Sequence, residues 1–395
     1  METETPPKTA LERKPMYQKT RAWIELNMEN LAYNVEQMKS RLPGNCRLMP
    51  AVKANAYGHG MIPIAKALNK LGIRDFCVAA AKEGAELRKA GIEGEILVLG
   101  YTHPEAFPLL LKYDLTQTVV DASYARLLAG YGKKFKVHIS VDTGMRRLGE
   151  RSEHLSSILS FWEYQNLAIT GLYSHLCVAD SLSPMDIQFT LMQFQRFDTI
   201  IDALRQKGIN GFATHIQSSY GFLNYPEFHY DYIRPGIALY GCNSLLSDQP
   251  RLTLSLRPVL SLKARLGSVR PLLPGESAGY GLTYTALRPM VIGTASIGYA
   301  DGIPRSLSSN GYALLRGRRV PIIGRICMDQ LLLDVTEISD AAPMDEVVFI
   351  GRSSFTQDDQ TFSDEIKAEE LALQGQTISN EILSCLGERL DRIVL

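Results

Sequence analysis

The chain has 395 residues, of which 45% are hydrophobic and 21% charged, and its 42 basic residues balance 42 acidic ones. This length and composition are typical of a globular protein with one large and one smaller domain. The zero net charge provides no field that would favour nucleic acid or an anionic membrane. No apolar run approaches the ~18 to 20 residues that span a bilayer, so we expect no membrane segment.

The first 18 residues are polar and contain prolines, and we expect them to form a flexible tail. Six cysteines are scattered along the chain without a Cys-x-x-Cys pair. This distribution favours reduced thiols and a cytoplasmic location, and it gives no reason to expect a metal site.

Short apolar runs alternate with amphipathic helical segments between Arg47 and Gly241, after a first predicted helix over Met28–Leu42. Eight such strand–helix units predict a (β/α)8 barrel. A doubly wound open sheet is the alternative, although no Gly-x-Gly-x-x-Gly follows the first strand. The predicted strands are Arg47–Val52, Asp75–Ala80, Glu95–Leu99, Thr116–Val120, Phe135–Val141, Ala168–Ser174, Ala213–Gln217 and Gly236–Tyr240.

After about Leu252 the pattern changes to short runs with period-2 alternation, which predicts a mostly antiparallel β domain. Helices near Ile366–Leu373 and Thr377–Leu386 close it, and Ala22–Leu26 is expected to join one of the two sheets. We therefore predict a barrel over 19–252 and a second domain over 253–395. The β-domain strands are predicted at Val259–Arg265, Gly267–Val269, Met290–Ile297, Tyr312–Leu315, Arg319–Ile323, Gln330–Val335 and Glu346–Ile350.

Lys53 directly follows the first predicted strand, and Tyr57 lies four residues later among small and polar residues. Burial at a strand end makes an ammonium easier to deprotonate, and a neutral amine is what a Schiff base with an aldehyde cofactor requires. A lone lysine in this position is more often a surface residue that caps a strand. The surrounding ten residues favour the cofactor interpretation.

Polar residues also follow later predicted strands, where barrel enzymes carry their active sites. Arg147 follows strand five and His175 ends strand six, although a lone histidine is more often structural. Ser219 follows strand seven, and Arg234 to Ile237 stand at the start of the predicted strand eight. A seryl hydroxyl and backbone N–H groups near Gly236 are suited to a phosphate group, although Ser-Ser alone is usually a turn.

Taken together, seven ordered motifs resemble the alanine racemase family of fold-type III enzymes, from about Arg21 to the carboxyl end. The motifs are Ala51–Gly60, Val141–Gly149, Gly171–His175, Tyr232–Gly241, Ala278–Tyr284, Ile297–Gly302 and Gly324–Gln330. The resemblance implies an isomerase that uses pyridoxal 5'-phosphate to interconvert L- and D-alanine, and serine as a second substrate, for peptidoglycan precursors.

The resemblance also implies roles for single residues. Lys53 would carry the cofactor and act as one of two catalytic bases, and Tyr280 would be the opposing base. Arg234 would face the pyridine nitrogen, while Arg147 would lie near the cofactor phenolate and the substrate carboxylate. His175 would orient the catalytic tyrosine. The remaining matches are Tyr57, Ser219, Gly236 and Ile237 for the phosphate, Tyr299 near the entrance, and Met328 for the substrate carboxylate.

In this family the positions of Tyr280 and Met328 reach the barrel mouth from a partner subunit, so the resemblance implies a homodimer with shared active sites. A tyrosine has a reference pKa near 10, so acting as a base at neutral pH needs about 4 kcal/mol of stabilisation of the phenolate. Cations such as Arg147 are the kind of neighbour that supplies it.

Three positions differ from the usual family pattern. Ser140 stands where many members carry a lysine that becomes carbamylated and positions the arginine, so Arg147 must be held by something else. Ser218 replaces an asparagine. Asn380 replaces a pocket tyrosine and looks like the serine/alanine racemases of vancomycin resistance, whose membrane domain would then be missing here. Alternatively, Asn380 only caps the helix that follows.

Two other functions share parts of this pattern. Basic amino-acid decarboxylases have the same pair of domains, but they place an acidic residue opposite the pyridine nitrogen where this chain has Arg234. A pyridoxal-phosphate homeostasis protein would lack the second domain, and with it Tyr280 and Met328. The racemase interpretation is therefore preferred.

Overall fold

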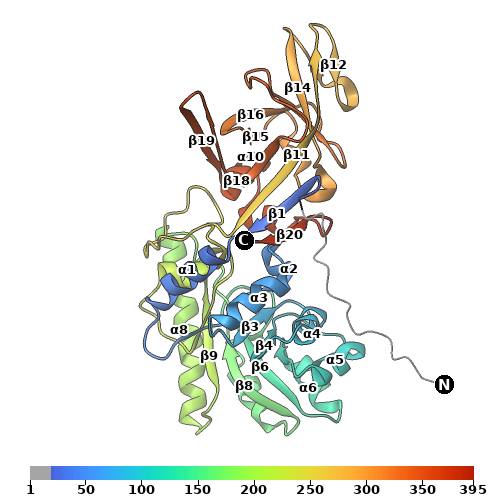
Figure 1. Ribbon diagram of the computed structural model, residues 1–395. Coiled ribbons are helices and arrows are strands. Elements are labelled where there is room, and N and C mark those ends of the chain that lie inside the picture. Colours follow the sequence, from blue (N-terminus) through green and yellow to red (C-terminus); the bar gives the residue numbers. More distant parts are fainter. Residues whose placement is uncertain (1–18) are drawn as a thin grey trace, which may run out of the picture. The chain divides into compact units, whose positions relative to one another are not determined.

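The computed structural model describes residues 19–395, which divide into two compact units (Figure 1). The predicted tail, 1–18, lies outside the described residues. The barrel unit comprises Leu26–Leu260, Lys367–Leu386 and Val394–Leu395, and the β unit comprises the remaining described residues. The division differs from the predicted one in its last part, because the two helices within Lys367–Leu386 belong to the barrel unit rather than to the second domain.

The barrel unit contains eight parallel strands in the order β2-β10-β9-β8-β6-β5-β4-β3. A single parallel bridge between Ala51 and Cys77 joins the two ends of this sheet, so the predicted barrel is confirmed and nearly closed. The strands are β2 (Arg47–Leu48), β3 (Asp75–Val78), β4 (Glu95–Val98), β5 (Thr116–Val119), β6 (Phe135–Asp142), β8 (Leu167–Tyr173), β9 (Ala213–Ser218) and β10 (Tyr232–Arg234), and the short β7 (Glu150–Arg151) pairs with β6.

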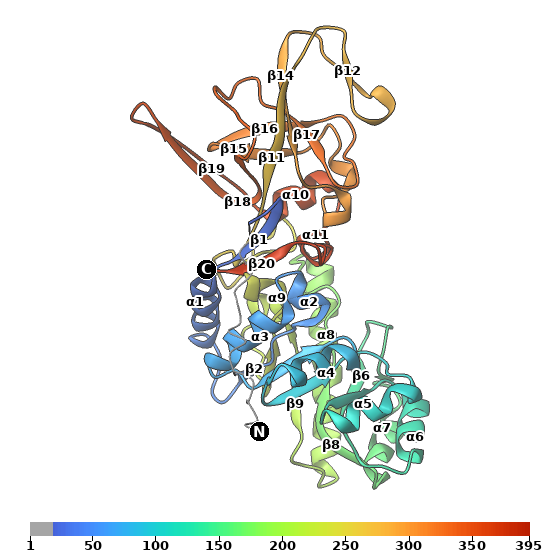
Figure 2. The same cartoon turned by 45° about the vertical axis from the view of Figure 1, so that its right-hand side comes forward.

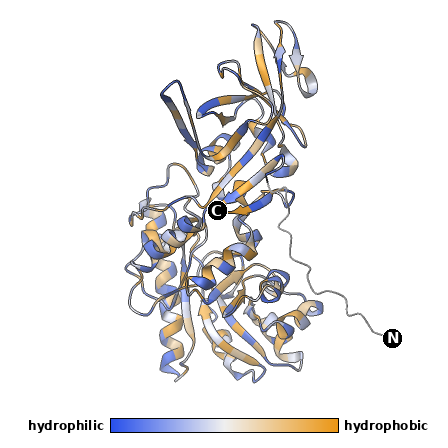
Figure 3. Cartoon of the chain, in the orientation of Figure 1, coloured by the Kyte–Doolittle hydropathy of each residue, from blue (hydrophilic) through white to orange (hydrophobic). Residues whose placement is uncertain are grey.

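Helices alternate with these strands, as Figure 2 shows from a second side. The longest, α8 (Pro184–Gln206), begins where the Ser183 side chain accepts from the Asp186 N–H, with proline at the first helical position. Figure 3 shows hydrophobic and hydrophilic residues alternating along it. The other helices of this unit are α1 (Met28–Lys39), α2 (Lys53–Tyr57), α3 (Met61–Lys70), α4 (Ala81–Lys89), α5 (Phe107–Lys112), α6 (Ala122–Gly130), α7 (Leu155–Ser160), α9 (Ser219–Asn224), α10 (Ala368–Gly375) and α11 (Ser379–Ser384), with 3₁₀ turns η1 (Pro104–Ala106), η2 (Phe161–Glu163) and η3 (Ile237–Tyr240).

The eighth strand differs from the prediction. It is β10, Tyr232–Arg234, and the segment predicted as strand eight forms the 3₁₀ helix η3 instead. Pro235 ends the strand because it has no N–H to donate to a neighbour. Arg234 and Gly236 therefore lie at the carboxyl end of strand eight, not at its start.

The β unit is built on a sheet in the order β19-β18-β15-β16-β17-β14-β11-β1-β20. As predicted, β1 (Ala22–Leu26) joins a sheet. In contrast to the prediction, the two strands expected on either side of Leu266 form one continuous strand, β11 (Leu260–Leu272). The other strands are β14 (Met290–Ala295), β15 (Tyr312–Leu315), β16 (Arg318–Ile323), β17 (Leu331–Asp334), β18 (Glu346–Gln357), β19 (Gln360–Ile366) and β20 (Asp391–Val394), with β12 (Ser277–Ala278) and β13 (Tyr284–Thr285) as a separate pair and 3₁₀ turns η4 (Tyr280–Leu282), η5 (Tyr299–Asp301) and η6 (Arg305–Leu307).

The hairpin of β18 and β19 was not predicted beyond Ile350. Its strands pair from Gly351 with Ile366 to Gln357 with Gln360. Most of its residues are polar and at least partly exposed on both faces. A two-stranded ribbon of this kind buries neither face, so it lacks the apolar alternation by which a strand is recognised in sequence.

Candidate active site

A cavity of about 260 Å³ opens at the carboxyl ends of the barrel strands. Lys53 follows β2, Arg147 follows β6, His175 follows β8, Ser219 follows β9 and Arg234 ends β10. The structure thus brings together the predicted residues of the barrel unit. The cavity is lined by Ala51, Lys53, Tyr57, Leu99, Ser140, Val141, Asp142, Met145, Arg147, Leu148, Tyr173, Ser174, His175, Ser218, Ser219, Tyr220, Arg234, Gly236, Ile237, Ser244 and Asn380.

Lys53 begins a turn whose backbone is left-handed. The φ angles from Ala54 to Tyr57 are 52°, 53°, 54° and 51°, and Gly58 continues at 77°. Each such L-residue costs roughly 1–2 kcal/mol relative to the right-handed form. Two hydrogen bonds offset part of this cost. The Ala56 N–H donates to the Val52 carbonyl at 2.9 Å, and the Ala54 N–H donates to Glu83 Oε1 at 2.8 Å. The turn directs the residues after Lys53 along the cavity edge, where Tyr57 lines the wall.

The pKa of the Lys53 ammonium is lowered from its ordinary value, mainly by burial and then by the positive charge of Arg147, with a smaller contribution from Arg234. A lysine that loses its proton more easily is suited to attack a carbonyl carbon, because the neutral amine is the nucleophile. This is the chemistry that the sequence predicts for Lys53.

The loops after β9 and β10 form a compact cradle. The Ser219 hydroxyl oxygen accepts from the N–H groups of Gly236 at 3.0 Å and Ala238 at 3.3 Å. A Cβ on Gly236 would lie 2.5 Å from the Tyr57 hydroxyl oxygen, so only glycine allows the tyrosine to come so close. Burial raises the pKa of Tyr57 to about 12, and its hydroxyl remains a neutral donor. Hydroxyls and backbone N–H groups gathered around a glycine fit the phosphate of pyridoxal phosphate.

Arg234 is buried and ends a polar column within the barrel. Its Nη2 donates to the Ser174 carbonyl at 2.7 Å, and its Nη1 contacts Nδ1 of His215. His215 Nε2 lies 2.9 Å from Nδ1 of His138, whose Nε2 lies 2.9 Å from Glu95 Oε1. These contacts within the barrel fix the position of Arg234. Its guanidinium has no acceptor, so it could only donate a hydrogen bond to the ring nitrogen of a cofactor.

His175 shares this wall with Arg234, whose Nη2 lies 3.3 Å from His175 Nδ1. Burial, and then the positive charges of Arg234, Arg147 and Lys53, together lower the pKa of His175 to about 3. The imidazole is therefore neutral at physiological pH and can donate one hydrogen bond and accept one.

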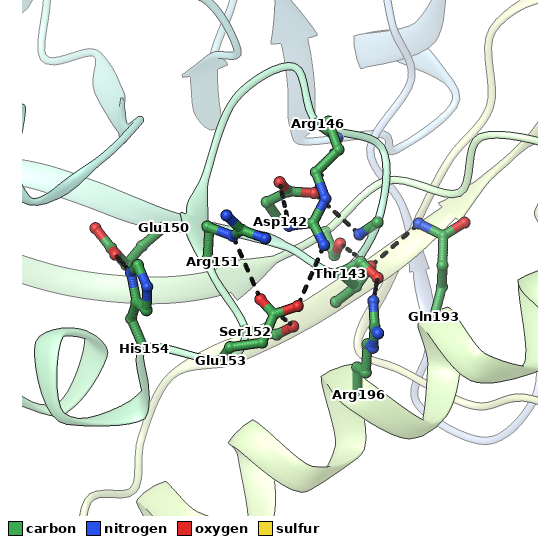
Figure 4. A network of polar contacts seen from close by, with 12 residues as sticks. Asp142, Thr143, Arg146, Glu150, Arg151, Ser152, Glu153, His154, Gln193 and Arg196 are labelled. Atoms are coloured by element: carbon green, nitrogen blue, oxygen red, sulfur yellow. Dashed lines mark hydrogen bonds and ion pairs between the residues drawn. The ribbon is translucent and has the colours of Figure 1, made fainter.

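The loop that carries Arg147 is closed by Asp142 at the end of β6 (Figure 4). Asp142 Oδ1 accepts from the N–H groups of Gly144 at 2.9 Å and Arg146 at 3.0 Å. Arg146, at a φ of 58°, then forms ion pairs of 3.2 Å with Asp142 and with Glu153. Within residues 19–395 the Arg147 guanidinium has no hydrogen bond or ion pair of its own, so the loop backbone decides where it lies.

Asn380 reaches the same cavity from α11, far along the chain. The helix packs closely on the turn after Lys53, since a Cβ on Gly58 would lie 1.9 Å from the Leu383 carbonyl oxygen. The alternative that Asn380 caps this helix is wrong, because the N-cap is Ile378 and no side chain caps it. In the described chain, Asn380 Oδ1 is buried without a hydrogen-bond partner.

The other three predicted site residues belong to the β unit. The exposed fractions of Tyr280, Tyr299 and Met328 are 68%, 42% and 52%, so each presents its side chain at the surface. The Tyr299 N–H donates to the Cys327 carbonyl at 3.0 Å, and the Ala300 N–H donates to the Met328 carbonyl at 3.0 Å. Tyr299 and Met328 thus lie on adjoining segments of the β unit.

Sequence reasoning missed His215, although it lies within a predicted strand and contacts Arg234. Histidine is rarely placed in the centre of an apolar strand without a partner, and that was the available signal. Gln193 of α8, which bonds two loops of the site, was also missed. A polar residue on the buried face of an amphipathic helix was the signal there.

Two family models cover the chain. The alanine racemase N-terminal domain matches residues 26–244, and the alanine racemase C-terminal domain matches residues 259–394. The chain belongs to the alanine racemase family. Together with the barrel and the antiparallel sheet, this confirms the predicted family and fold.

Curated relatives within the family carry several names. An alanine racemase from Carboxydothermus hydrogenoformans is 40% identical over 94% of this chain and 98% of its own length. A serine/alanine racemase from Enterococcus gallinarum is 39% identical over 94% of this chain but only 51% of its own length. Two amino-acid racemases from Enterococcus faecalis give the same coverage, so the chain spans about half the length of these relatives.

Solved structures of the family agree with the fold. The alanine racemase from Bartonella henselae with covalently bound pyridoxal phosphate matches with a TM-score of 0.79 and 28% identity, covering 95% of this chain and 100% of that one. Across residues 19–395, no helix combines the length and apolar composition needed to cross a membrane.

Proposed function

We propose that the protein is a pyridoxal-phosphate-dependent racemase that interconverts the L and D forms of alanine. The observation that carries this proposal is the position of Lys53, a buried lysine with a lowered pKa that opens onto the same cavity as the Ser219, Gly236 and Tyr57 cradle. Lys53 and the cradle line one cavity, so one small molecule can meet both. The bound cofactor of the Bartonella henselae relative supports the choice of pyridoxal phosphate.

Racemisation needs proton transfer on both faces of one carbon atom, and hence two groups on opposite sides. Lys53 is one of them, and the partner subunit's Tyr280 is the other. The exposed Tyr280, Tyr299 and Met328 are compatible with a homodimer, because their side chains are free to reach the site of a second copy. Met328 and Arg147 would receive the substrate carboxylate, and Tyr299 would stand at the entrance.

The cofactor, when bound, supplies the electron sink for this reaction, and the chain supplies orientation and charge. Arg234 would face the ring nitrogen with a donor that cannot accept a proton, so the nitrogen would stay unprotonated. His175 and Arg147 then provide the polar wall toward which the tyrosine is directed. Arg234 also argues against a decarboxylase, which would use an acidic residue in this place.

Serine is a second substrate, and Asn380 is the observation that favours it. Its Oδ1 is a buried acceptor without a partner in the described chain, at the wall of the cavity. A serine hydroxyl can donate to this atom, whereas the methyl group of alanine cannot. The similarity to the serine/alanine racemase of Enterococcus gallinarum supports the same idea.

The test is direct. The purified protein is incubated with L-alanine and, separately, with L-serine, and the enantiomers are measured by chiral chromatography. The proposal expects D-alanine and D-serine, and a visible absorbance band that borohydride removes. Amine products without racemisation would identify a decarboxylase, and the band without any turnover would identify a binding protein.

The setting of the reaction is also a proposal. The six cysteines are all free, which suits a reducing compartment and hence the cytoplasm. The D-amino acid would there supply peptidoglycan precursors. Measuring the D-alanine content of precursors in cells that lack the protein tests this step.

A further inference from the structure

We propose that Gln193 is a positioning residue for Arg147, and this rests on the proposed role of Arg147 in holding the substrate carboxylate. Gln193 does not line the cavity. It acts through the loop after β6, which carries Arg147, and through the loop after β8, which carries His175. Ser140, and not a lysine, lines the cavity together with Arg147, whose guanidinium has no hydrogen bond or ion pair within residues 19–395.

The side chain of Gln193 lies between these two loops and is fully buried. Its Nε2 donates to Thr143 Oγ1 at 3.2 Å and to the His175 carbonyl at 3.0 Å. Its Oε1 accepts from the Cys177 N–H at 3.1 Å. Both N–H donors and the carbonyl acceptor are therefore used, and the amide fixes the distance between the two loops.

Thr143 connects the pair further. Its hydroxyl lies 2.8 Å from the hydroxyl of Ser174, so the loop after β6 and the end of β8 are also joined directly. Arg196 Nη1 donates to the Thr143 carbonyl at 3.0 Å, as Figure 4 shows. Thr143 is thus held through both its side chain and its backbone.

Three residues of α8 form the supporting face. Phe189, Gln193 and Arg196 follow each other at spacings of four and three, which places them on one side of the helix. The Phe189 ring packs on Gly144, where an added Cβ would lie 3.0 Å from the ring and 3.5 Å from Gln193 Cγ. This face of α8 therefore contacts the loop at its start, at Thr143 and Gly144, which precede Arg147 by four and three positions.

The amide is needed for more than packing. Leucine at 193 would fill most of the space but would leave the Cys177 N–H and the His175 carbonyl without their partner, which the loops would correct by moving. Glutamate would keep the acceptor for the Cys177 N–H and place a carboxylate oxygen against the His175 carbonyl. Both changes displace the Arg147 loop while leaving the catalytic lysine untouched.

The experiment measures KM and kcat for L-alanine and the Kd of acetate, a bare carboxylate, by calorimetry on the holoenzyme. We expect Gln193→Leu and Gln193→Glu to raise both KM and the acetate Kd about tenfold, with kcat changed less than about threefold. Gln195→Leu is the matched control, because Gln195 lies on the same helix with its side chain exposed. It should change neither quantity.

A double-mutant cycle decides whether Gln193 acts through Arg147. In the Arg147→Gln background, Gln193→Leu should raise the acetate Kd by less than twofold, since the residue that it positions is gone. A full tenfold effect of Gln193→Leu in the Arg147→Gln background would overturn the proposed role of Gln193 but not that of Arg147. An unchanged acetate Kd in Arg147→Gln itself would overturn the proposed role of Arg147, and the present proposal with it. If Gln193→Leu fails to fold, the cycle is run with Gln193→Glu.

Discussion

Arg234 donates from Nη1 to Nδ1 of His215, and this contact determines the protonation of a buried column. Arginine has no acceptor, so His215 Nδ1 carries no proton, and its Nε2 must donate to His138 Nδ1. The single proton of His138 is then on Nε2, where it faces Glu95. Burial lowers the pKa of His215 well below its ordinary value, and the Arg234 charge acts in the same direction.

The first prediction concerns stability in acid. His175 has a folded pKa near 3 against an ordinary value of 6.5, so below pH 6.5 the unfolded chain binds a proton that the folded chain does not. The contribution of the neutral His175 to the free energy of unfolding is fully present above pH 6.5 and is lost as the pH falls toward 3. We expect His175→Asn to reduce the slope of unfolding free energy against pH by up to about 1.4 kcal/mol per unit in this window. Urea unfolding between pH 6.5 and 4 measures it.

The control for this measurement is His229→Asn, because His229 is exposed in a loop. Its slope should match that of the unmodified protein. If His175→Asn also matches, then the buried imidazole is not what makes the protein sensitive to acid.

The second prediction concerns Lys53, the proposed attachment site of the cofactor. Lys53→Ala should abolish racemisation, a loss of at least about 10³-fold, because covalent attachment and one catalytic base disappear together. The borohydride-sensitive absorbance band should disappear with it. Lys66→Ala changes an exposed lysine of α3 and should retain both. A reducible adduct on another lysine in Lys53→Ala, located by peptide mass mapping, would falsify the assignment.

The third prediction concerns the shared site. If Lys53 and Tyr280 of one site come from different subunits, then Lys53→Ala and Tyr280→Phe proteins are each inactive, but their hybrids contain one intact site. Mixing them under conditions that exchange subunits should restore up to a quarter of the activity of the unmodified dimer, as expected for random pairing with one intact site in half the dimers. Native mass spectrometry establishes the exchange. Exchange without recovery would mean that each site lies within one chain.

The fourth prediction concerns substrate choice. Asn380→Tyr removes a buried acceptor from the cavity wall and should lower serine turnover more than alanine turnover. One neutral hydrogen bond is worth roughly 0.5 to 1.5 kcal/mol, so the serine-to-alanine ratio of kcat/KM should fall about two- to tenfold. Parallel kinetics with both substrates give the ratio. An unchanged ratio would show that Asn380 does not select the substrate.

The fifth prediction concerns the cradle. A Cβ on Gly236 would meet the Tyr57 hydroxyl at 2.5 Å, so Gly236→Ala must displace the ring or the loop. We expect the Kd for pyridoxal phosphate to rise at least about tenfold, as measured by equilibrium dialysis of the apoprotein. Gly208→Ala is less suitable as a control, because Gly208 has a φ of 77°. Gly130→Ala, at a helical glycine with open space around it, should leave the Kd unchanged.

The cavity could be largely predicted from sequence because its residues directly follow apolar strands. In the sequence Lys53, His175 and Ser219 each come within two residues of a predicted apolar strand, and parallel strand ends meet at one rim. Strand eight could not be placed correctly, since Ile237–Tyr240 is apolar and fully buried, and a short buried 3₁₀ helix has the composition of a strand.

The contacts made by the polar supports of the site could not be predicted. Gln193 and His215 bond to residues that are distant in sequence, such as Thr143 and Arg234. Local periodicity reports which face of an element is buried, but it does not report what a buried polar group meets there. Asn380 was placed at the pocket only through the family resemblance, because a helix of six residues carries little pattern of its own.

The left-handed turn after Lys53 has a chemical consequence. Its φ values near +50° are those that D-residues adopt without cost, since a D-residue is the mirror image of an L-residue. Ala54 and Ala56 are L-alanines held in the conformation natural to D-alanine. A copy of this chain made by chemical synthesis, with D-alanine at these two positions, would keep the turn and be relieved of part of its strain. We therefore expect the segment beside Lys53 to accept, at two sites, the enantiomer that the reaction is proposed to make.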